Sequence, residues 1–292
     1  MIQGLQSLDR LSPLHLFIFC APALDNIPIP VILKNMDRLN GKRILITGAS
    51  RGLGRQLAID FARQGAAKIA LTARNAADLE RVKAEVQAAA PTAQVSAIAA
   101  DLRSQDDIER LVATALSESG GRLDVLVNNA SALGPTPMPY LLDYPLEDFR
   151  TVLEVNLIAP YLLIKKALPA MIEHGGSIIN ITSDAGRTGY PGWGAYGISK
   201  FGLEGMSETW AAELADSSVR INWVDPGDMN TQMHREAEPE EDPAEWADPA
   251  DVTGVFIYLA SDESAGVSGK RFQAQEENWG QSPDAKSMAG GE

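Results

Sequence analysis

A tyrosine and a lysine lie four residues apart in residues 195–200, which read AYGISK. On a helix, side chains at this spacing lie one above the other on the same face. A phenol has a pKa near ~10 and is a poor acid at neutral pH, whereas a nearby ammonium stabilises the phenolate and lowers that pKa. Tyr196 and Lys200 are therefore a candidate general acid/base pair. Because chance can also supply this spacing, the interpretation depends on the rest of the chain.

Two polar residues upstream are candidates for the same site. Ser183 lies 13 residues before the tyrosine, directly after an apolar run, and Asn156 lies in a stretch with helical character. Taken singly, a serine after a strand is often a turn residue or a helix cap, and a helical asparagine usually faces solvent. Their assignment to a site rests on their joint placement with Tyr196 and Lys200.

A glycine-rich turn opens the predicted domain. Residues 43–47 form a short apolar, β-branched run that is typical of a buried parallel strand, and residues 55–64 have helical periodicity. Glycines let the backbone approach a ligand, and a helix N-terminus offers unpaired N–H groups and a positive dipole to a phosphate. A tight strand–helix turn that binds nothing is the alternative. The turn has the spacing T-G-x-x-x-G-x-G and reads Thr47, Gly48, Ala49, Ser50, Arg51, Gly52, Leu53, Gly54.

Strands and helices alternate through the remainder of the chain. This alternation predicts an α/β protein with a single-domain Rossmann fold, in which a doubly wound parallel sheet carries helices on both faces. Ligands of such sheets bind at the carboxyl ends of the strands, so the polar residues that follow those ends should converge on one crevice. Strands are expected at 68–72, 94–99, 124–127, 177–181, 219–224 and 267–272, and helices at 75–90, 105–119, 149–170 and 196–215.

Composition narrows the class of protein. The chain has 292 residues, 45% of them hydrophobic, which is sufficient for one large core over residues 36–275. A net charge of −14 argues against nucleic acid or an anionic membrane surface as the partner. The single cysteine excludes an intramolecular disulfide, and the three histidines form no metal-ligand pattern, so no metal is expected. We expect a cytoplasmic enzyme.

The two ends of the chain differ from the predicted domain. Residues 1–35 contain a short apolar run interrupted by prolines, which is too short to span a bilayer and a poor secretory signal. We interpret this segment as a flexible N-terminal extension or a mis-assigned start, with the folded domain beginning at Met36. Residues 276–292 are interpreted as a C-terminal tail.

The ordered motifs resemble those of the short-chain dehydrogenase/reductase family. The resemblance covers about residues 37–275, and six motifs in one order are far more specific than any one of them. It implies that Tyr196 exchanges a proton with the substrate oxygen, that Lys200 lowers the tyrosine pKa and holds the nicotinamide ribose, and that Ser183 hydrogen-bonds the developing alkoxide. It places Asn156 at a helix irregularity, where it holds a water that relays protons to the lysine. The motifs are residues 47–54, Asp101-Leu102, Asn128-Asn129-Ala130, Asn156, Ser183 and Tyr196-x-x-x-Lys200.

The resemblance also bears on the cofactor. In the family an acidic residue at the end of the second strand binds the adenosine ribose of NAD, but here the sequence is Leu-Thr-Ala-Arg over 71–74. Arg51 and Arg74 supply guanidinium groups suited to a 2′-phosphate, so NADP(H) is the predicted cofactor. The alternative is that both arginines are ordinary surface charges. The predicted cofactor-binding residues are Gly48, Ser50, Arg51, Gly52, Leu53, Gly54, Arg74, Asp101, Leu102, Asn129, Ala130, Tyr196, Lys200, Pro226, Gly227 and Thr231.

Three features depart from the family pattern. Ser131 follows Asn-Asn-Ala at a position where the family usually has glycine. The glycine-rich ending that follows the last strand in the family is replaced here by residues 273–277, and this second departure puts the family's tetramer interface in doubt. Residues 236–251 hold eight carboxylates and no lysine or arginine. Such a run is usually a solvated loop, and the alternative is a lid that disfavours anionic substrates.

Two functions from different classes follow. The first is an NADPH-dependent carbonyl reductase, or the reverse alcohol dehydrogenase, acting on a small-molecule carbonyl or alcohol and assembled as a homodimer or homotetramer. The second is a non-catalytic NADP-binding sensor or scaffold. The complete set of four catalytic residues favours the enzyme. The expected substrate pocket is mixed apolar and polar, with Asp184, Tyr190, Trp193, Met229 and Met233 near it.

Overall fold

A computed structural model describes residues 37–276 of the chain. The expectations for residues 1–35 and for the tail after 276 lie outside the described residues. Seven strands form one sheet in the order β3-β2-β1-β4-β5-β6-β7, and every neighbouring pair is parallel. The order reverses between β1 and β4, as in a doubly wound sheet. The predicted fold class is therefore confirmed.

The strands lie close to their expected positions. The first and third match residue for residue, and most of the others differ by one residue at an end. The last strand is the exception, because it pairs with β6 over only three residues rather than from 267 onward. The strands are β1 Arg43–Thr47, β2 Lys68–Ala73, β3 Gln94–Ala99, β4 Val125–Asn128, β5 Gly176–Ile181, β6 Val219–Asp225 and β7 Arg271–Gln273.

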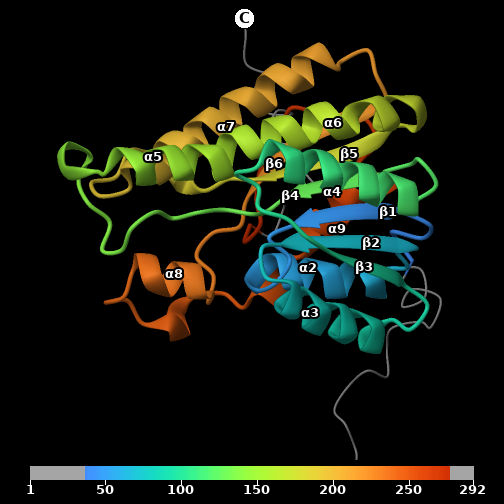
Figure 1. Ribbon diagram of the computed structural model, residues 1–292, viewed down its shortest axis with the longest axis horizontal. Helices are drawn as coiled ribbons and strands as arrows, with labels where there is room; N and C mark the ends of the chain where they lie inside the picture. The colour runs from blue at the N-terminus through green and yellow to red at the C-terminus, as the bar shows by residue number, and fades with distance from the viewer. Residues whose placement is uncertain (1–36, 277–292) are drawn as a thin grey trace, which may run out of the picture.

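Helices cover both faces of the sheet, and each face has its own hydrophobic cluster (Figure 1). Phe61 and Phe256 are fully buried on one face, and Leu111 and Ile164 on the other. One layer contains α2 Gly52–Arg63, α3 Ala76–Ala89 and α9 Gly254–Ala260; the other contains α4 Gln105–Glu118, α5 Leu146–Leu153, α6 Ala159–His174 and α7 Gly194–Glu213.

Local chemistry sets where the helices begin and end. Asn75 caps α3 by accepting a hydrogen bond from the N–H of Ala77 at 2.9 Å. The prediction that the helix over 149–170 ends at residue 170 is wrong. The helix α6 continues to His174, and Met171 within this extra turn is fully buried. It ends there because Gly175 has a φ of 77°, a conformation that favours glycine.

The run Leu146–His174 is long and apolar enough, by length and composition alone, to cross a membrane. It comprises α5, a π-helical turn at Glu154–Ile158, and α6. In this fold it packs beside α4 and α7, and Leu163 and Ile164 on it belong to the hydrophobic cluster. Burial within the domain accounts for part of its apolar character, and Leu146, Ile158, Tyr161 and Ile172 on this run are exposed.

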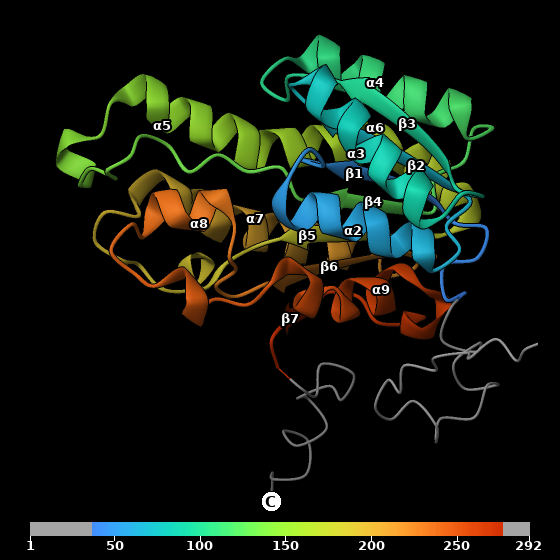
Figure 2. The ribbon, with the colours of Figure 1, turned by 90° about the horizontal axis from the view of Figure 1, so that it is seen from below.

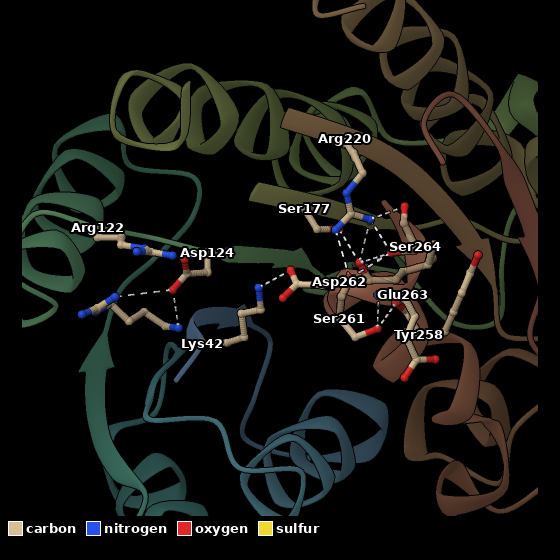
Figure 3. A network of polar contacts seen from close by, with 12 residues as sticks. Lys42, Arg122, Asp124, Ser177, Arg220, Tyr258, Ser261, Asp262, Glu263 and Ser264 are labelled. Carbon is tan, nitrogen blue, oxygen red and sulfur yellow. Dashed lines mark hydrogen bonds and ion pairs between the residues drawn. The ribbon is translucent and has the colours of Figure 1, made fainter. Parts of the chain in front are cut away.

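Polar side chains lie at the amino-end edge of the sheet (Figure 3). Lys42 pairs with Asp262 at 2.6 Å, and Arg122 pairs with Asp124 at 2.6 Å. Arg220 donates to the carbonyl of Leu259 near the end of α9 and to those of Ser261 and Ser264 just after it. In a doubly wound sheet the ligand crevice is expected at the opposite, carboxyl edge, on whose side α8 Gln232–Ala237 and its flanking loops lie (Figure 2).

Candidate active site

The first turns of α7 carry the tyrosine and the lysine. The Nζ atom of Lys200 lies 5.3 Å from the centroid of the Tyr196 ring. The same Nζ donates to the carbonyl of Ile181, the last residue of β5, at 2.8 Å. Ser183 follows β5 by two residues, and its side chain hydrogen-bonds the phenol of Tyr196. The structure therefore brings together three of the predicted catalytic residues.

The acid/base properties of the pair differ from the simple expectation. The pKa of the Tyr196 phenol is raised, because burial disfavours the phenolate and the charges of Asp225 and Asp184 add to this effect. Hydrogen bonds from Ser183 and Ser131 oppose the shift only in part. Burial therefore dominates the pKa of this tyrosine, and the effect of Lys200 on it stays a prediction.

Burial also changes Lys200 itself. Its side chain is fully enclosed, and the loss of water lowers its pKa to about 8. The carboxylates Asp225 and Glu204 act in the opposite direction and keep the shift from being larger. The ammonium is therefore charged at neutral pH and loses its proton in mildly alkaline solution.

The hydroxyl of Ser183 has two protein partners besides the tyrosine. It donates to Asp184 Oδ1 at 2.8 Å and accepts from the N–H of Ala185 at 3.2 Å. A hydroxyl has one proton, so Ser183 cannot donate to Asp184 and to the phenol oxygen at the same time. It must rotate away from Asp184 to donate to a substrate oxygen.

Asn156 lies in the π-helical turn, at the helix irregularity that the resemblance implied. Its Oδ1 accepts from the N–H of Ala132 at 2.7 Å and from Ser131, and its Nδ2 donates to the Ala132 carbonyl and to Ser199 Oγ, each at 2.9 Å. The side-chain amide is fully used by these partners. It therefore ties the loop after β4 to α7 next to Lys200, and the water relay stays a prediction.

The glycine turn is shaped by close backbone contacts with the loop after β4. A Cβ on Gly48 would lie 2.8 Å from the Cα of Ala130, and one on Gly54 would lie 2.5 Å from the Gly48 carbonyl. Asn129 holds this arrangement by donating through Nδ2 to the carbonyls of Thr47 and Gly48, at 2.8 and 3.2 Å. Only glycine fits at these two positions without displacing the backbone.

The N-terminus of α2 suits an anion. Its N-cap, Arg51, has extended backbone and makes no side-chain capping bond within the described part of the chain. The first N–H groups and the helix dipole therefore face the mouth of the glycine turn. Gly52 has a φ of 53°, and Thr231 lies 3.4 Å from where its Cβ would be, so the loop after β6 reaches this turn. These features fit the diphosphate of a dinucleotide.

Three arginines lie in the loops that follow β1, β2 and β3. Arg51 hydrogen-bonds Gln232, and Arg74 follows the strand and is exposed. The pKa of Asp101 is lowered, first by its hydrogen bond to Arg103 and, among smaller causes, by the charge of Arg74. Arg74 therefore lies close to the loop after β3. Arg103 belongs to this cluster and was missed from the sequence, where nothing distinguishes it from a surface arginine.

The other predicted cofactor residues differ in burial and in their hydrogen-bond partners. Pro226 and Gly227 follow β6, and Gln275 donates to the Pro226 carbonyl at 3.0 Å. Leu53 and Leu102 are buried in the two hydrophobic clusters. Their side chains therefore serve the core, and only their backbone is left to face a cofactor. Ser50 is half-buried in the glycine turn, where its carbonyl accepts from Arg81 at 3.3 Å.

A buried ionic cluster lies behind these residues, and the sequence analysis missed it. Arg271 on β7 donates to Glu204 at 3.0 Å, to Asp225 at 2.8 Å and to the carbonyl of Ser183 at 3.1 Å. Glu204 follows Lys200 by one helical turn, and Thr182 donates to it at 2.7 Å. One guanidinium thus joins β5, β6, β7 and α7.

A cavity of about 440 Å³ opens beside the tyrosine. It includes all five of the residues expected near the substrate. The acidic segment also contributes, since the half-buried Glu238 and the exposed Glu241 line the cavity. Glu236 and Glu240 are exposed and do not line it, and the lid alternative stays a prediction. The catalytic end is lined by Thr182, Ser183, Asp184, Tyr196, Asp225, Pro226 and Gly227.

Comparisons with known proteins identify the family that this chain matches and several of its relatives. The sequence model of the short chain dehydrogenase family matches residues 42–242. The uncharacterized oxidoreductase YciK of Escherichia coli K12 is 34% identical over 240 residues, covering 82% of this chain and 94% of YciK. The 3-oxoacyl-[acyl-carrier-protein] reductase FabG of Thermotoga maritima is 36% identical over 244 residues, covering 80% and 96%. A solved short chain dehydrogenase from Shigella flexneri 2a, complexed with NADP, is 32% identical, with a TM-score of 0.78 over 82% of this chain and all of its own.

Proposed function

Because this chain belongs to the short-chain dehydrogenase/reductase family, we propose that it is an NADP(H)-dependent oxidoreductase that transfers a hydride between the nicotinamide and a carbonyl or alcohol substrate. The observation that carries the proposal is the meeting of Ser183, Tyr196 and Lys200 at the end of one cavity. A binding module used as a sensor or scaffold has no need of this combination.

The cofactor assignment is supported by the fit of the chain. The glycine turn and the uncapped N-terminus of α2 suit the diphosphate, and Arg51 and Arg74 suit a 2′-phosphate. A relative of known structure, from Shigella flexneri, is complexed with NADP. When bound, the nicotinamide supplies the hydride, and the protein supplies orientation and electrostatics.

The side chains divide the remaining chemistry. The Tyr196 phenol is protonated at neutral pH because its pKa is raised, so it holds the proton that the oxygen of a carbonyl being reduced requires. Ser183, once turned from Asp184, hydrogen-bonds the same oxygen as negative charge develops. The Lys200 ammonium stabilises the phenolate left behind and so favours release of the proton, and Asn156 fixes the turn of α7 that carries the lysine. The same residues serve alcohol oxidation, with the proton moving the other way.

A substrate screen with a matched variant tests the proposal. NADPH oxidation is followed over a panel of ketones, aldehydes, quinones and acyl thioesters, and Tyr196→Phe is compared with the wild type. The variant should lose at least about a hundredfold in turnover. It should bind NADPH as the wild type does, measured by nicotinamide fluorescence. Unchanged turnover in the variant would refute the mechanism, and NADPH binding without turnover over the whole panel would favour the sensor or scaffold.

We also propose a homodimer or homotetramer. The support is that α6 and α7 expose large apolar side chains, with Tyr161, Ile198 and Phe201 all well exposed. Light scattering coupled to gel filtration measures the mass directly. A monomer at micromolar concentration would contradict the proposal.

A further inference from the structure

Five carboxylates line the substrate cavity: Asp184, Asp225, Asp228, Glu238 and Glu241. Among residues 37–276, the side chains that line it include no lysine or arginine. Asp225 is neutralised by its buried contact with Arg271. Four carboxylates have no arginine or lysine contact among the described ion pairs: Asp184, Asp228 and Glu241, which are exposed, and Glu238, which is half-buried. A substrate bound in the cavity therefore experiences a negative electrostatic potential.

One of these carboxylates acts directly at the reacting groups. Asp184 Oδ1 accepts from Ser183 Oγ at 2.8 Å. Its charge contributes to the raised pKa of the Tyr196 phenol and of Tyr190. A second anion brought into the cavity beside Tyr196 would meet this charge at short range.

The carboxylates at the rim are held in place. Trp246 is buried, and its Nε1 donates to Glu241 at 3.1 Å. His234 packs edge-on against Trp246, with ring centroids 4.4 Å apart, and its Nε2 lies 3.7 Å from Asp228 and 3.9 Å from Glu241. The N–H of Ala247 donates to the Asp228 carbonyl at 3.2 Å. This part of the acidic segment is anchored to the domain and is not a free loop.

Aromatic side chains line the same cavity as the carboxylates. Tyr190 and Trp193 line the cavity, and Trp193 packs against Tyr196 with ring centroids 5.5 Å apart. Aromatic faces attract cations, and the attraction is larger where carboxylates lower the cost of removing the cation from water. Carboxylates and aromatic rings together form the chemistry that recognises an ammonium group.

We propose that this cavity selects its carbonyl substrate by charge: it takes neutral substrates and, with preference, substrates that carry an ammonium group, and it rejects substrates with a carboxylate, sulfonate or phosphate near the carbonyl. The inference rests on the proposed function, since it names the substrate class of the same site. It separates this protein from reductases whose substrates are anionic acyl carriers or acyl thioesters.

Three acetophenones that differ only in their para substituent test the inference: a trimethylammonium, a methyl and a carboxylate group. Reduction by NADPH is measured at low and high ionic strength. In parallel, binding of each ketone to the enzyme–NADP⁺ complex is measured by calorimetry, which does not depend on turnover. We expect the cationic ketone to exceed the anionic one by at least about tenfold at low salt, and the ratio to shrink as salt rises.

Paired charge-removing variants locate the effect. Glu238→Gln/Glu241→Gln keeps the side-chain shape and should narrow the cation-to-anion ratio by about threefold or more. Glu173→Gln, an exposed site at the far end of α6, removes one charge away from the cavity and should leave the ratio unchanged. Equal or absent binding of all three ketones, or a ratio that the double variant does not alter, would overturn the inference. Charge-selective binding without any turnover would instead count against the proposed function alone.

Discussion

Replacement of Arg271 by methionine tests the buried ionic cluster most directly. The arginine side chain is 7% exposed and contacts Glu204 and Asp225, whose side chains are 9% and 5% exposed. Methionine fills much of the same volume but removes the positive charge, so two buried carboxylates lose their main partner. Loss of one partner from a buried ion pair costs about 3–5 kcal/mol. The Thr182 hydroxyl and the N–H of Gly227 still donate to these carboxylates, which favours the lower end of that range.

The assay is unfolding by heat and by denaturant, with an internal control. A loss of about 3 kcal/mol corresponds to a fall in Tm of about 6–12 °C for a domain of this size. Arg187 lies 3.7 Å from the same Glu204, but its side chain is 64% exposed. Arg187→Met should therefore cost at most about 1 kcal/mol. The two variants remove the same charge near the same carboxylate and differ in burial.

The pH dependence supplies a second check. Burial raises the pKa of Asp225, while Arg271 acts to lower it, so loss of the arginine raises that pKa further. A group whose folded pKa is raised stabilises the fold at pH values below its unfolded pKa, and this stabilisation is lost as pH rises through the folded pKa. The penalty for Arg271→Met should thus be largest at pH 7 and shrink as the pH falls through the raised pKa of Asp225. A penalty no greater than that of Arg187→Met, or one independent of pH, would refute the argument.

Three further predictions concern the site. The pKa of Lys200 is lowered to about 8, so the catalytic efficiency of carbonyl reduction should be highest below pH 8 and fall about fivefold between pH 8 and pH 9. A pH–rate profile that stays flat to pH 9.5 would contradict a role for the charge of the lysine. Arg51→Ala/Arg74→Ala should raise the KM for NADPH by about 10- to 100-fold and leave that for NADH within about twofold, and equal effects on both would remove the 2′-phosphate assignment. Gly54→Ala puts a Cβ 2.5 Å from the Gly48 carbonyl, so it should weaken NADPH binding and lower the free energy of unfolding by about 1–3 kcal/mol. Gly205→Ala is the control, because the space around Gly205 is open. It should be neutral or stabilising in the same fluorescence and melting measurements.

The fold was predictable because its signals are local. Short buried strands, glycine turns and helix caps are specified by residues close together in the sequence, as at β1 and at the Asn75 cap of α3. The errors occurred where a tertiary contact decided the boundary. Met171 extends α6 because the sheet buries it, and β7 is short because only three of its residues reach β6.

The candidate site was predictable in part for the same reason. The glycine turn and the Tyr196–Lys200 pair consist of residues within one or two turns of each other, so their spacing is readable in the sequence. Arg271 lies 67 residues from Glu204 and 46 from Asp225, and no local pattern marks it. Arg271 reaches these two carboxylates because the order of the strands places β7 beside β6.

The sequence by itself determined the family, the doubly wound sheet and the meeting of Ser183, Tyr196 and Lys200 at its carboxyl edge, because these depend on residue type, order and spacing. Only the tertiary structure decided how those residues titrate and what surrounds them. The Tyr196 pKa is raised by burial and by two carboxylates, and the acidic segment becomes a cavity wall because Trp246 and His234 anchor it. Electrostatic energies depend on distance and on exclusion of water, and neither quantity is written in the order of the residues.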